Sequence, residues 1–196
     1  MPKLGMEAIR REALVNATIA EIGESGSLEV TVSQIARRAG VSPALAHHYF
    51  GSKDQIFLAA MRRILSDFGV DVQVRLKAAT GPVERLHGII AASFGPEQFD
   101  REIVAAWLAF YVQAQKSPEA ARLLKVYAQR LDSNLVFNLR QIVSEEAARK
   151  ISQGLSSMID GFYIRHALQD RVPDRDATKR LVCEYLELCL QKETRT

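Results

Sequence analysis

The chain has 196 residues, of which 47% are hydrophobic and 25% charged, a composition typical of a globular protein that buries its own core. Its 26 Lys and Arg against 23 Asp and Glu leave a formal net charge of +3, too small to indicate a nucleic-acid-binding protein by itself. The sequence has no apolar run of 18 residues and no signal-like start, which argues against a membrane-spanning or secreted protein and predicts a cytoplasmic one.

The first expected helix covers residues 6–24, after a short basic arm at residues 1–5. Leu14, Ala17, Thr18 and Ile22 recur along it at helical spacing and predict its core-facing side. Gly26 follows in the position where a glycine commonly ends a helix.

Residues 31–53 (TVSQIARRAGVSPALAHHYFGSK) have the pattern of two short helices joined by a tight turn. Thr31 and Gln34 fit a capping box at the start of the first helix. Gly40 fits its end, because glycine takes the left-handed conformation without steric cost. Ser42-Pro43 then fits an N-cap and first helical residue. This is the pattern of a helix-turn-helix, although a helical hairpin inside an all-α domain has the same local signals.

The second helix of this motif, ending at Phe50, would be the one that enters the DNA major groove. No acidic residue occurs from Val30 to Gly51, so this segment does not repel phosphate. For the two histidines in it, a solvated surface role is the alternative to DNA contact, and Arg37 and Arg38 either reach phosphate or form a charged outer face. The candidate DNA contacts are Thr31, Ser33, Ser42, Pro43, Ala44, Leu45, His47, His48, Tyr49 and Lys53.

The remaining sequence reads as helices separated by Pro, Gly and Ser breaks, the last of them at residues 172–174. Ser52 and Gln55 predict a long helix that continues to about residue 77. Further helices are expected over 83–94, 101–116, 117–143, 145–169 and 177–191. Since no strand pattern appears, we predict an all-α chain of about nine helices. A three-helix helix-turn-helix domain at residues 1–52 would precede a helical-bundle effector-binding and dimerisation domain at residues 53–196.

The order I-A-x-x-A-G-V-S, followed by a Tyr-Phe pair and a lysine, resembles the DNA-binding domain of the TetR family of bacterial repressors. The resemblance implies a homodimer that binds a double-stranded, palindromic DNA operator with two recognition helices about 34 Å apart. The sequence departs from the family pattern at Ala44 and His47, where a glycine and a tyrosine are common. The details of base reading are therefore not carried over.

Three further segments, MPKLGMEAIRREALVNATI, AWLAFY and SSMIDGFYIRHAL, are similar to the choline-responsive repressors of glycine betaine synthesis within that family. This similarity implies repression of genes for choline transport and for choline conversion to glycine betaine, with choline as the inducer. The alternative is a repressor of the same family that answers to a different small ligand, such as a lipophilic cation. Neither reading requires a cofactor or a metal.

The candidate effector site contains aromatic side chains that share one helix face. Aromatic rings attract quaternary ammonium groups, although aromatics at helical spacing are also ordinary core residues. Asp160 lies in an otherwise apolar run and needs a partner, either Arg165 or a cationic ligand. The expected site residues are Trp107, Phe110, Tyr111, Asp160 and Tyr163.

The helices over 145–169 and 177–191 are either the dimer surface or an intramolecular core. Small residues that would let two helices approach closely are Gly154, Ser157, Met158 and Gly161, and apolar area comes from Leu155, Ile159, Phe162, Leu181, Leu186 and Leu190.

An enzyme is not expected, because the sequence has no GxSxG, GxGxxG, P-loop or HExxH motif and its four histidines have no metal-ligand spacing. Cys183 and Cys189, six residues apart on one helix, point in different directions and predict neither a zinc site nor a disulfide.

Overall fold

A computed structural model of the chain describes residues 5–27, 29–169 and 174–194, and within these ranges the structure is helical, with no strand. Residues 1–4 of the predicted basic arm (residues 1–5) and most of the predicted break at residues 172–174 lie outside the described residues. The nine helices are α1 (Met6–Ser25), α2 (Val32–Arg38), α3 (Pro43–Phe50), α4 (Lys53–Ala78), α5 (Pro82–Ser93), α6 (Arg101–Ala114), α7 (Pro118–Leu139), α8 (Glu145–Ala167) and α9 (Arg175–Thr194). The all-α prediction and its sequence of elements are confirmed over the described residues.

The largest boundary difference is at α7, which ends at Leu139 and not near Val143. Residues 140–143 form turns, and Ser144 then caps α8 by accepting a hydrogen bond from the backbone N–H of Ala147 at 3.2 Å. Because Ser144 starts a new helix, residues 140–143 form the connection between α7 and α8 and are not part of α7.

Side-chain caps at the predicted positions start four helices, α2, α3, α4 and α7. Thr31 and Gln34 form the complete capping box of α2: the Thr31 hydroxyl accepts from the Gln34 N–H at 3.2 Å, and the Gln34 side-chain oxygen accepts from the Thr31 N–H at 2.7 Å. The hydroxyls of Ser42, Ser52 and Ser117 accept from the third residue of α3, α4 and α7 at 3.2 to 3.3 Å. Local sequence therefore determines where these helices begin.

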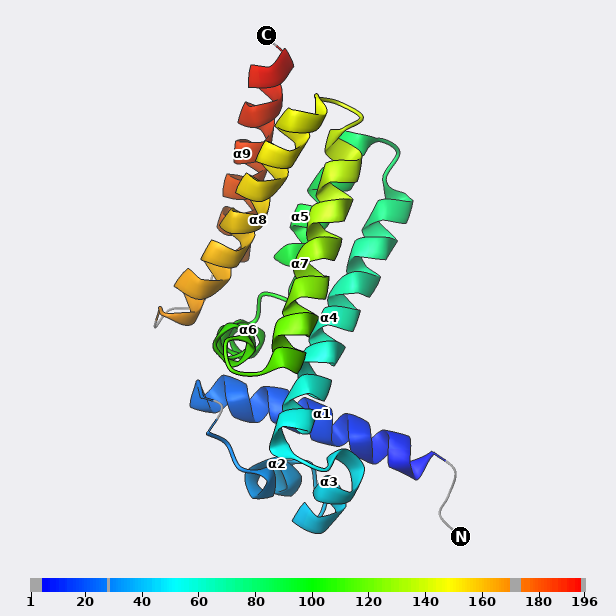
Figure 1. The fold of residues 1–196 in the computed structure, drawn as a ribbon, viewed down its shortest axis with the longest axis vertical. Helices are drawn as coiled ribbons and strands as arrows, with labels where there is room; N and C mark the ends of the chain where they lie inside the picture. Colours follow the sequence, from blue (N-terminus) through cyan, green and yellow to red (C-terminus); the bar gives the residue numbers. More distant parts are fainter. Residues whose placement is uncertain (1–4, 28, 170–173, 195–196) are drawn as a thin grey trace.

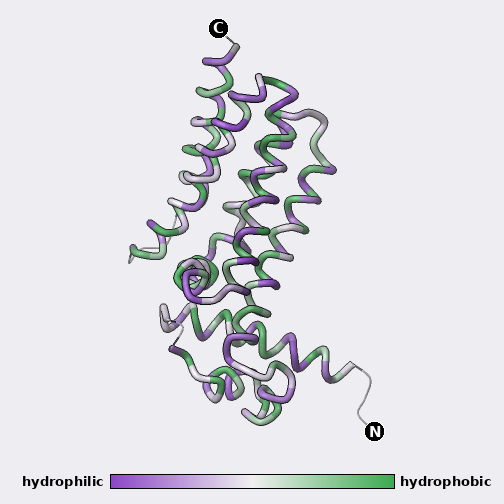
Figure 2. Tube along the Cα trace, in the orientation of Figure 1, coloured by the Kyte–Doolittle hydropathy of each residue, from purple (hydrophilic) through white to green (hydrophobic). Residues whose placement is uncertain are grey.

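The helices form two regions, which we name the head (α1–α3) and the bundle (α4–α9). Figure 1 shows α1 crossing below the bundle with α2 and α3 beneath it, while α4 rises from the head along the bundle. α6 is seen end-on directly above α1, and α8 and α9 lie together at one side. Hydrophobic and hydrophilic residues alternate along the helices (Figure 2), as expected where each buries only one face.

Head and bundle share one continuous core and touch closely. Gly23 of α1 faces Glu102 of α6, and a Cβ at Gly23 would lie 2.5 Å from the Glu102 Cβ and 2.6 Å from its Cα. At the same end, the Gln55 side-chain amide of α4 donates to a Glu119 carboxylate oxygen of α7 at 2.8 Å. A displacement of α6 would therefore act directly on α1, and a displacement of α7 would act directly on the start of α4.

Candidate nucleic-acid interface and effector site

The turn between α2 and α3 has the geometry that its sequence predicts. Gly40 has φ +68°, a left-handed conformation that favours glycine, and the Val41 N–H donates to the Ala36 carbonyl at 3.0 Å. This hydrogen bond, from the second residue after the C-cap Ala39 back to the last turn of α2, is that of a Schellman motif. The turn fixes the direction in which α3 leaves α2.

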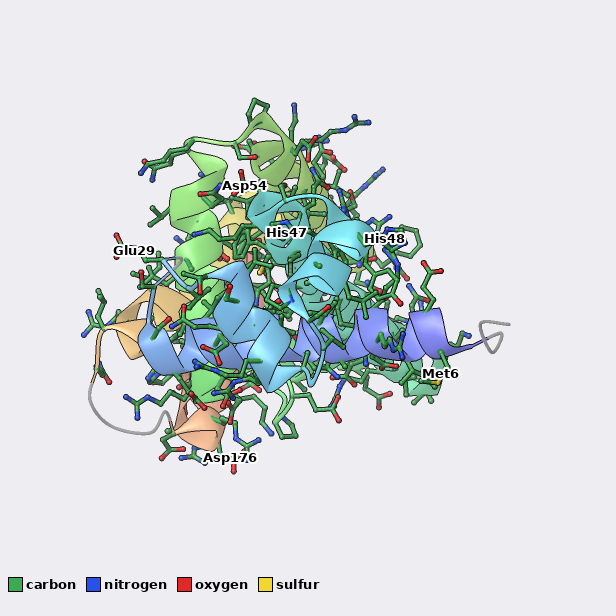
Figure 3. The ribbon with its side chains drawn as sticks, turned by 90° about the horizontal axis from the view of Figure 1, so that it is seen from below. Met6, Glu29, His47, His48, Asp54 and Asp176 are labelled. Carbon is green, nitrogen blue, oxygen red and sulfur yellow. The ribbon has the colours of Figure 1, made fainter. Side chains whose placement is uncertain are left out.

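α3 presents its predicted contact residues on the outer face of the head. Pro43, Ala44, His47 and His48 are exposed, whereas Ala46 is fully buried against the rest of the head. The view from below the molecule shows His47 and His48 on α3 at the surface nearest the viewer (Figure 3). Leu45 and Tyr49 are half-buried, and the remaining predicted contacts Thr31, Ser33, Ser42 and Lys53 are exposed. The predicted set thus lies on one end of the molecule.

His47 is also held by the end of its own helix. Its Nδ1 lies 3.2 Å from the Gly51 carbonyl oxygen, and Gly51 has φ +77°. When Nδ1 carries the proton and donates to that carbonyl, Nε2 is the acceptor that faces outward. The ring orientation of His47 is therefore set before any nucleic acid arrives.

Arg11 of α1 holds the C-terminal end of α3, a role that the sequence analysis missed. Its guanidinium donates to the Tyr49 carbonyl oxygen at 2.6 Å and lies 4.9 Å from the Phe50 ring centroid and 5.6 Å from that of Tyr49. Glu7 accepts a hydrogen bond from the Arg11 Nε at 3.2 Å. Arg11 is 38 residues from Tyr49, so no local pattern indicates the contact.

Arg38 forms ion pairs with two acids of α1 and does not point outward as a phosphate contact would. Its Nε lies 2.7 Å from a Glu21 carboxylate oxygen, and its other side pairs with Glu24. These two acids raise the pKa of Arg38, and the hydrogen bond from Arg38 lowers the pKa of Glu24. Arg38 was expected either to reach phosphate or to form a charged outer face; the structure instead pairs it with two acids, and this ion pair ties α2 to α1.

Two acids mark the edges of the acid-free surface. Glu29 lies before α2 and Asp54 lies in the first turn of α4, and both are exposed. Figure 3 shows Asp54 beside α3 and Glu29 at the opposite border of α2. A surface that accepts phosphate would therefore extend between these carboxylates.

In the bundle, aromatic rings from three helices surround Trp107. Trp107 is 3% exposed, and its ring centroid lies 4.7 Å from that of Tyr127, 5.7 Å from Tyr111, 5.8 Å from Tyr163 and 5.9 Å from Phe110. The Trp107 indole N–H is buried and has no hydrogen-bond partner among the described residues. The structure thus brings the predicted aromatic residues together and adds Tyr127, which the sequence analysis left out.

Asp160 lies beside this cluster, and its hydrogen-bond partner within the chain is Tyr111 and not Arg165. The Tyr111 hydroxyl donates to an Asp160 carboxylate oxygen at 2.9 Å, across 49 residues of sequence. Arg165 is exposed, and no ion pair joins it to Asp160 within the described part of the chain. Burial raises the pKa of Asp160, and the hydrogen bond from Tyr111 offsets this only in part. Among the described residues, an ionised Asp160 therefore has no cationic partner.

Phe110 and Tyr163 also serve the fold. Phe110 is fully buried and packs against Phe57 of α4, with ring centroids 6.3 Å apart. The Tyr163 hydroxyl donates to the Ser93 carbonyl oxygen at 2.6 Å and lies 3.0 Å from that of Gln98. Burial raises the pKa of Tyr163 well above its usual value, so it stays a neutral hydrogen-bond donor. Of the predicted site residues, Trp107 is the one whose buried polar atom has no hydrogen-bond partner among the described residues.

The α8–α9 pair combines core residues with an open surface. Leu155, Ile159 and Leu186 are fully buried inside the chain, so they cannot supply a dimer surface as their apolar character suggested. The space beside Gly154 is occupied by Tyr185 of the same chain, because a Cβ at Gly154 would lie 2.1 Å from the Tyr185 hydroxyl. By contrast, a Cβ at Gly161 would meet nothing within 4 Å, and Leu181 is 50% exposed.

Other kinds of site are not evident in the described residues. Their His, Cys, Asp and Glu side chains include no group of three placed to hold a metal ion. None of the described helices has the length and apolar character needed to span a membrane. Cys183 and Cys189 are free thiols, each half-buried.

Two family models match the chain, one in each region. The model described as bacterial regulatory proteins of the tetR family matches residues 14–60, and the model described as the C-terminal domain of BetI-type transcriptional repressors matches residues 82–191. Curated relatives match almost the full length. The HTH-type transcriptional regulator BetI of Brucella abortus is 53% identical over 190 residues, covering 97% of this chain and 96% of the relative. The regulator of the same name from Rhizobium meliloti is 49% identical over 191 residues, with 97% and 94% covered.

Solved structures share the fold at low sequence identity. A transcriptional regulator from Rhodococcus sp. Rha1 matches with a TM-score of 0.82 and 22% identity, covering 93% of this chain and 96% of its own. A transcriptional regulator from Saccharomonospora viridis, solved in complex with choline, matches with a TM-score of 0.76 and 22% identity, covering 90% and 95%. At these identities the likeness concerns the fold alone.

Proposed function

The chain belongs to the TetR family of bacterial regulatory proteins and carries a BetI-type repressor C-terminal domain, and from this premise we propose that it is a choline-released repressor of choline transport and glycine betaine synthesis genes. The family membership makes it a DNA-binding transcriptional regulator. It would act in the cytoplasm, without cofactor, metal or catalytic residue. The observation that supports choline most directly is a half-buried carboxylate that has no cationic partner among the described residues and lies beside the aromatic cluster around Trp107.

On DNA, the outer face of α3 would enter the major groove. Ala44 and Leu45 offer apolar contact to thymine methyl groups, and the outward nitrogen of His47 faces the base edges. Lys53 and the hydroxyls at the start of α2 would hold the phosphate backbone. The proposed contact set is Thr31, Ser33, Ser42, Pro43, Ala44, Leu45, His47, His48, Tyr49 and Lys53, with Arg11 positioning the end of α3. The functional boundary would lie at residues 52–53, where α4 begins.

In the bundle, choline would add the cation that Asp160 lacks. The faces of Trp107, Tyr111 and Tyr127 would surround the trimethylammonium group, each worth about 0.5–2 kcal/mol when desolvated. The unpaired Trp107 indole N–H would donate to the choline hydroxyl. Phe110 and Tyr163 would support the walls of this site through their own packing.

Release from DNA requires choline to favour the state that cannot bind the operator, since a ligand with equal affinity for both states shifts nothing. The ligand groups of α6 lie on the same helix whose first turn touches Gly23 of α1. A small displacement of α6 would therefore move α1, and with it the α3 end that Arg11 holds. The two recognition helices of a dimer would then lose their spacing of about 34 Å.

A homodimer is part of this proposal, because one α3 reads only half of a palindromic operator. The exposed side of the α8–α9 pair, with Gly161 and Leu181, supports it as the contact between copies. Sedimentation velocity of the wild type and of a Gly161→Arg variant tests this: the wild type should be dimeric and the variant monomeric. A dimeric variant would place the contact elsewhere.

The function is tested by a gel shift with the DNA upstream of the chain's own gene and of neighbouring choline genes. Nanomolar binding that millimolar choline abolishes is expected. Calorimetry then compares choline, betaine aldehyde and a longer-chain quaternary ammonium ion. If choline leaves operator binding unchanged, choline is not the inducer, but the chain is still a DNA-binding repressor. If only the lipophilic cation releases the operator, the alternative ligand class is favoured.

A further inference from the structure

A long open groove runs between α4 and α7, away from the α8–α9 pair, and of its lining residues the function proposed above uses only Tyr127. Its volume is about 1100 Å³. Figure 1 shows the two helices side by side on the side of the bundle opposite α9. Apolar side chains of both helices line the groove, namely Leu65, Phe68, Val72, Leu123, Val126 and Leu131.

The charges of the groove all have one sign. Arg62, Lys77 and Arg130 line it, and the described lining residues include no Asp or Glu. No ion pair or hydrogen bond joins any of the three to another described side chain. Other arginines of α4 are neutralised within the helix: the Nε atoms of Arg63 and Arg75 lie 2.8 and 2.9 Å from an aspartate four residues along. The groove thus keeps its positive charges available for an anion.

The shape of the groove fits a chain better than a compact ion. Arg62 and Lys77 are fifteen residues apart on α4, which corresponds to about 22 Å at 1.5 Å per residue. Between them, Val70 and Val74 are 61% and 59% exposed, and Val126 across the groove is 38% exposed. Exposed apolar side chains in a row lower their free energy when an apolar ligand covers them.

We propose that this groove binds a single-chain amphipathic anion, such as a medium- or long-chain carboxylate. The hydrocarbon chain would lie against the valines and Phe68, and the carboxylate would pair with Arg130 and Lys77. A second copy of this chain fits the groove less well, because a symmetric contact would bring two sets of three cations together. Choline is excluded from the groove by the sign of its charge.

Tyr127 connects the groove to the interior. It lines the groove, its ring centroid lies 5.9 Å from that of Phe68, and the Trp107 ring is 4.7 Å away on its other side. Trp107 is the only tryptophan of the chain. Its fluorescence therefore reports on an occupant of the groove without a label.

The test is a titration of the full-length protein with decanoate below its micellar concentration, followed by Trp107 fluorescence and calorimetry. One saturable site per chain is expected. Decan-1-ol, which has the same chain without the charge, and acetate, which has the charge without the chain, should each bind at least about tenfold more weakly. Equal binding of decanol or acetate would overturn the proposal, as would no binding of decanoate.

Variants locate the site. Lys77→Glu with Arg130→Glu should weaken decanoate binding about a hundredfold, whereas Lys125→Glu, on the same helix but outside the groove, should leave it unchanged. Val74→Asp should weaken it and Val112→Asp, an equally exposed valine on α6, should not. Unchanged decanoate affinity in both groove variants would overturn the assignment. Operator binding and choline response would be unaffected by that outcome, because the proposal does not depend on them.

Discussion

In the head, the residues proposed for function are mostly exposed and lie within 23 consecutive positions, whereas in the bundle they are mostly buried and come from three different helices. The head needs a rigid shape that presents side chains to a large partner, and the capping box of α2, the serine cap of α3 and a glycine turn provide that shape locally. The bundle needs an interior site, and Trp107, Tyr127 and Asp160 meet only because α6, α7 and α8 pack together. Substitutions should therefore separate the two regions: surface changes in the head should alter DNA affinity alone, and changes in the bundle should alter both ligand response and stability.

Asp160→Asn is expected to give the largest difference between its effect on ligand binding and its effect on DNA binding. Asparagine still accepts the Tyr111 hydrogen bond but removes the half-buried charge, and removing one partner of a buried ion pair costs about 3–5 kcal/mol. Choline affinity measured by calorimetry should fall a hundredfold or more, while operator affinity without choline stays the same. Unchanged choline affinity would show that the ammonium binds elsewhere.

Acidification should act through the same carboxylate. Burial raises the pKa of Asp160 in the folded state, so the folded protein takes up this proton more readily than the unfolded chain. This group therefore stabilises the unliganded fold as the pH falls through the folded-state pKa, and it weakens choline binding over the same window, above the usual aspartate range. Thermal melts and choline titrations across pH should show both trends in the wild type and neither in Asp160→Asn. Asp160→Asn should also raise the Tm of the unliganded protein at neutral pH.

Gly23→Ala should break the contact between the two regions. The new Cβ would lie 2.6 Å from the backbone Cα of Glu102, so α1 and α6 must move apart. We expect a loss of about 1–3 kcal/mol in the free energy of unfolding and a weaker effect of choline on operator binding. The control is Gly69→Ala, a helical glycine of α4 whose Cβ meets nothing within 4 Å. That variant should be as stable as the wild type or more so. Equal stability of both variants would contradict a close α1–α6 contact.

Arg11→Lys should lower operator affinity about tenfold, although it keeps the charge. Lysine cannot both stack on the Phe50 ring and reproduce the planar guanidinium contact to the Tyr49 carbonyl. Fluorescence anisotropy with labelled operator DNA measures the change, and its salt dependence should not alter. If Arg11→Lys binds the operator as tightly as the wild type and only Arg11→Ala loses affinity, Arg11 is a phosphate contact and not a positioning residue.

Lys53→Ala should have the smallest effect. Loss of one phosphate contact weakens binding to all DNA sequences similarly and reduces the slope of log K against log salt by about one. Lys125→Ala, on α7 of the bundle, is the matched control and should leave the slope unchanged. A normal slope in the Lys53 variant would remove this residue from the proposed DNA contacts.

The same contrast explains which predictions the sequence supported. The Thr31–Gln34 capping box, the Gly40 turn and the caps at Ser42 and Ser52 depend on residues a few positions apart, so local chemistry was enough. The Tyr111–Asp160 hydrogen bond spans 49 residues, and Arg165, the nearer charge in sequence, was the wrong alternative. Arg11 was missed for the same reason. The apolar residues of α8 gave no sign of whether they faced another chain or their own core, because periodicity identifies a buried face but not the surface that covers it.

The sequence by itself determined the order of the helices and the caps that start α2, α3 and α4, since helix propensity and capping act over single turns of the chain. Only the tertiary structure decided which aromatic rings meet, that Asp160 is left without a cation, and that Gly23 brings α1 against α6. Those features depend on how helices far apart in sequence approach one another. That approach is fixed by the packing of the whole core and not by any one segment.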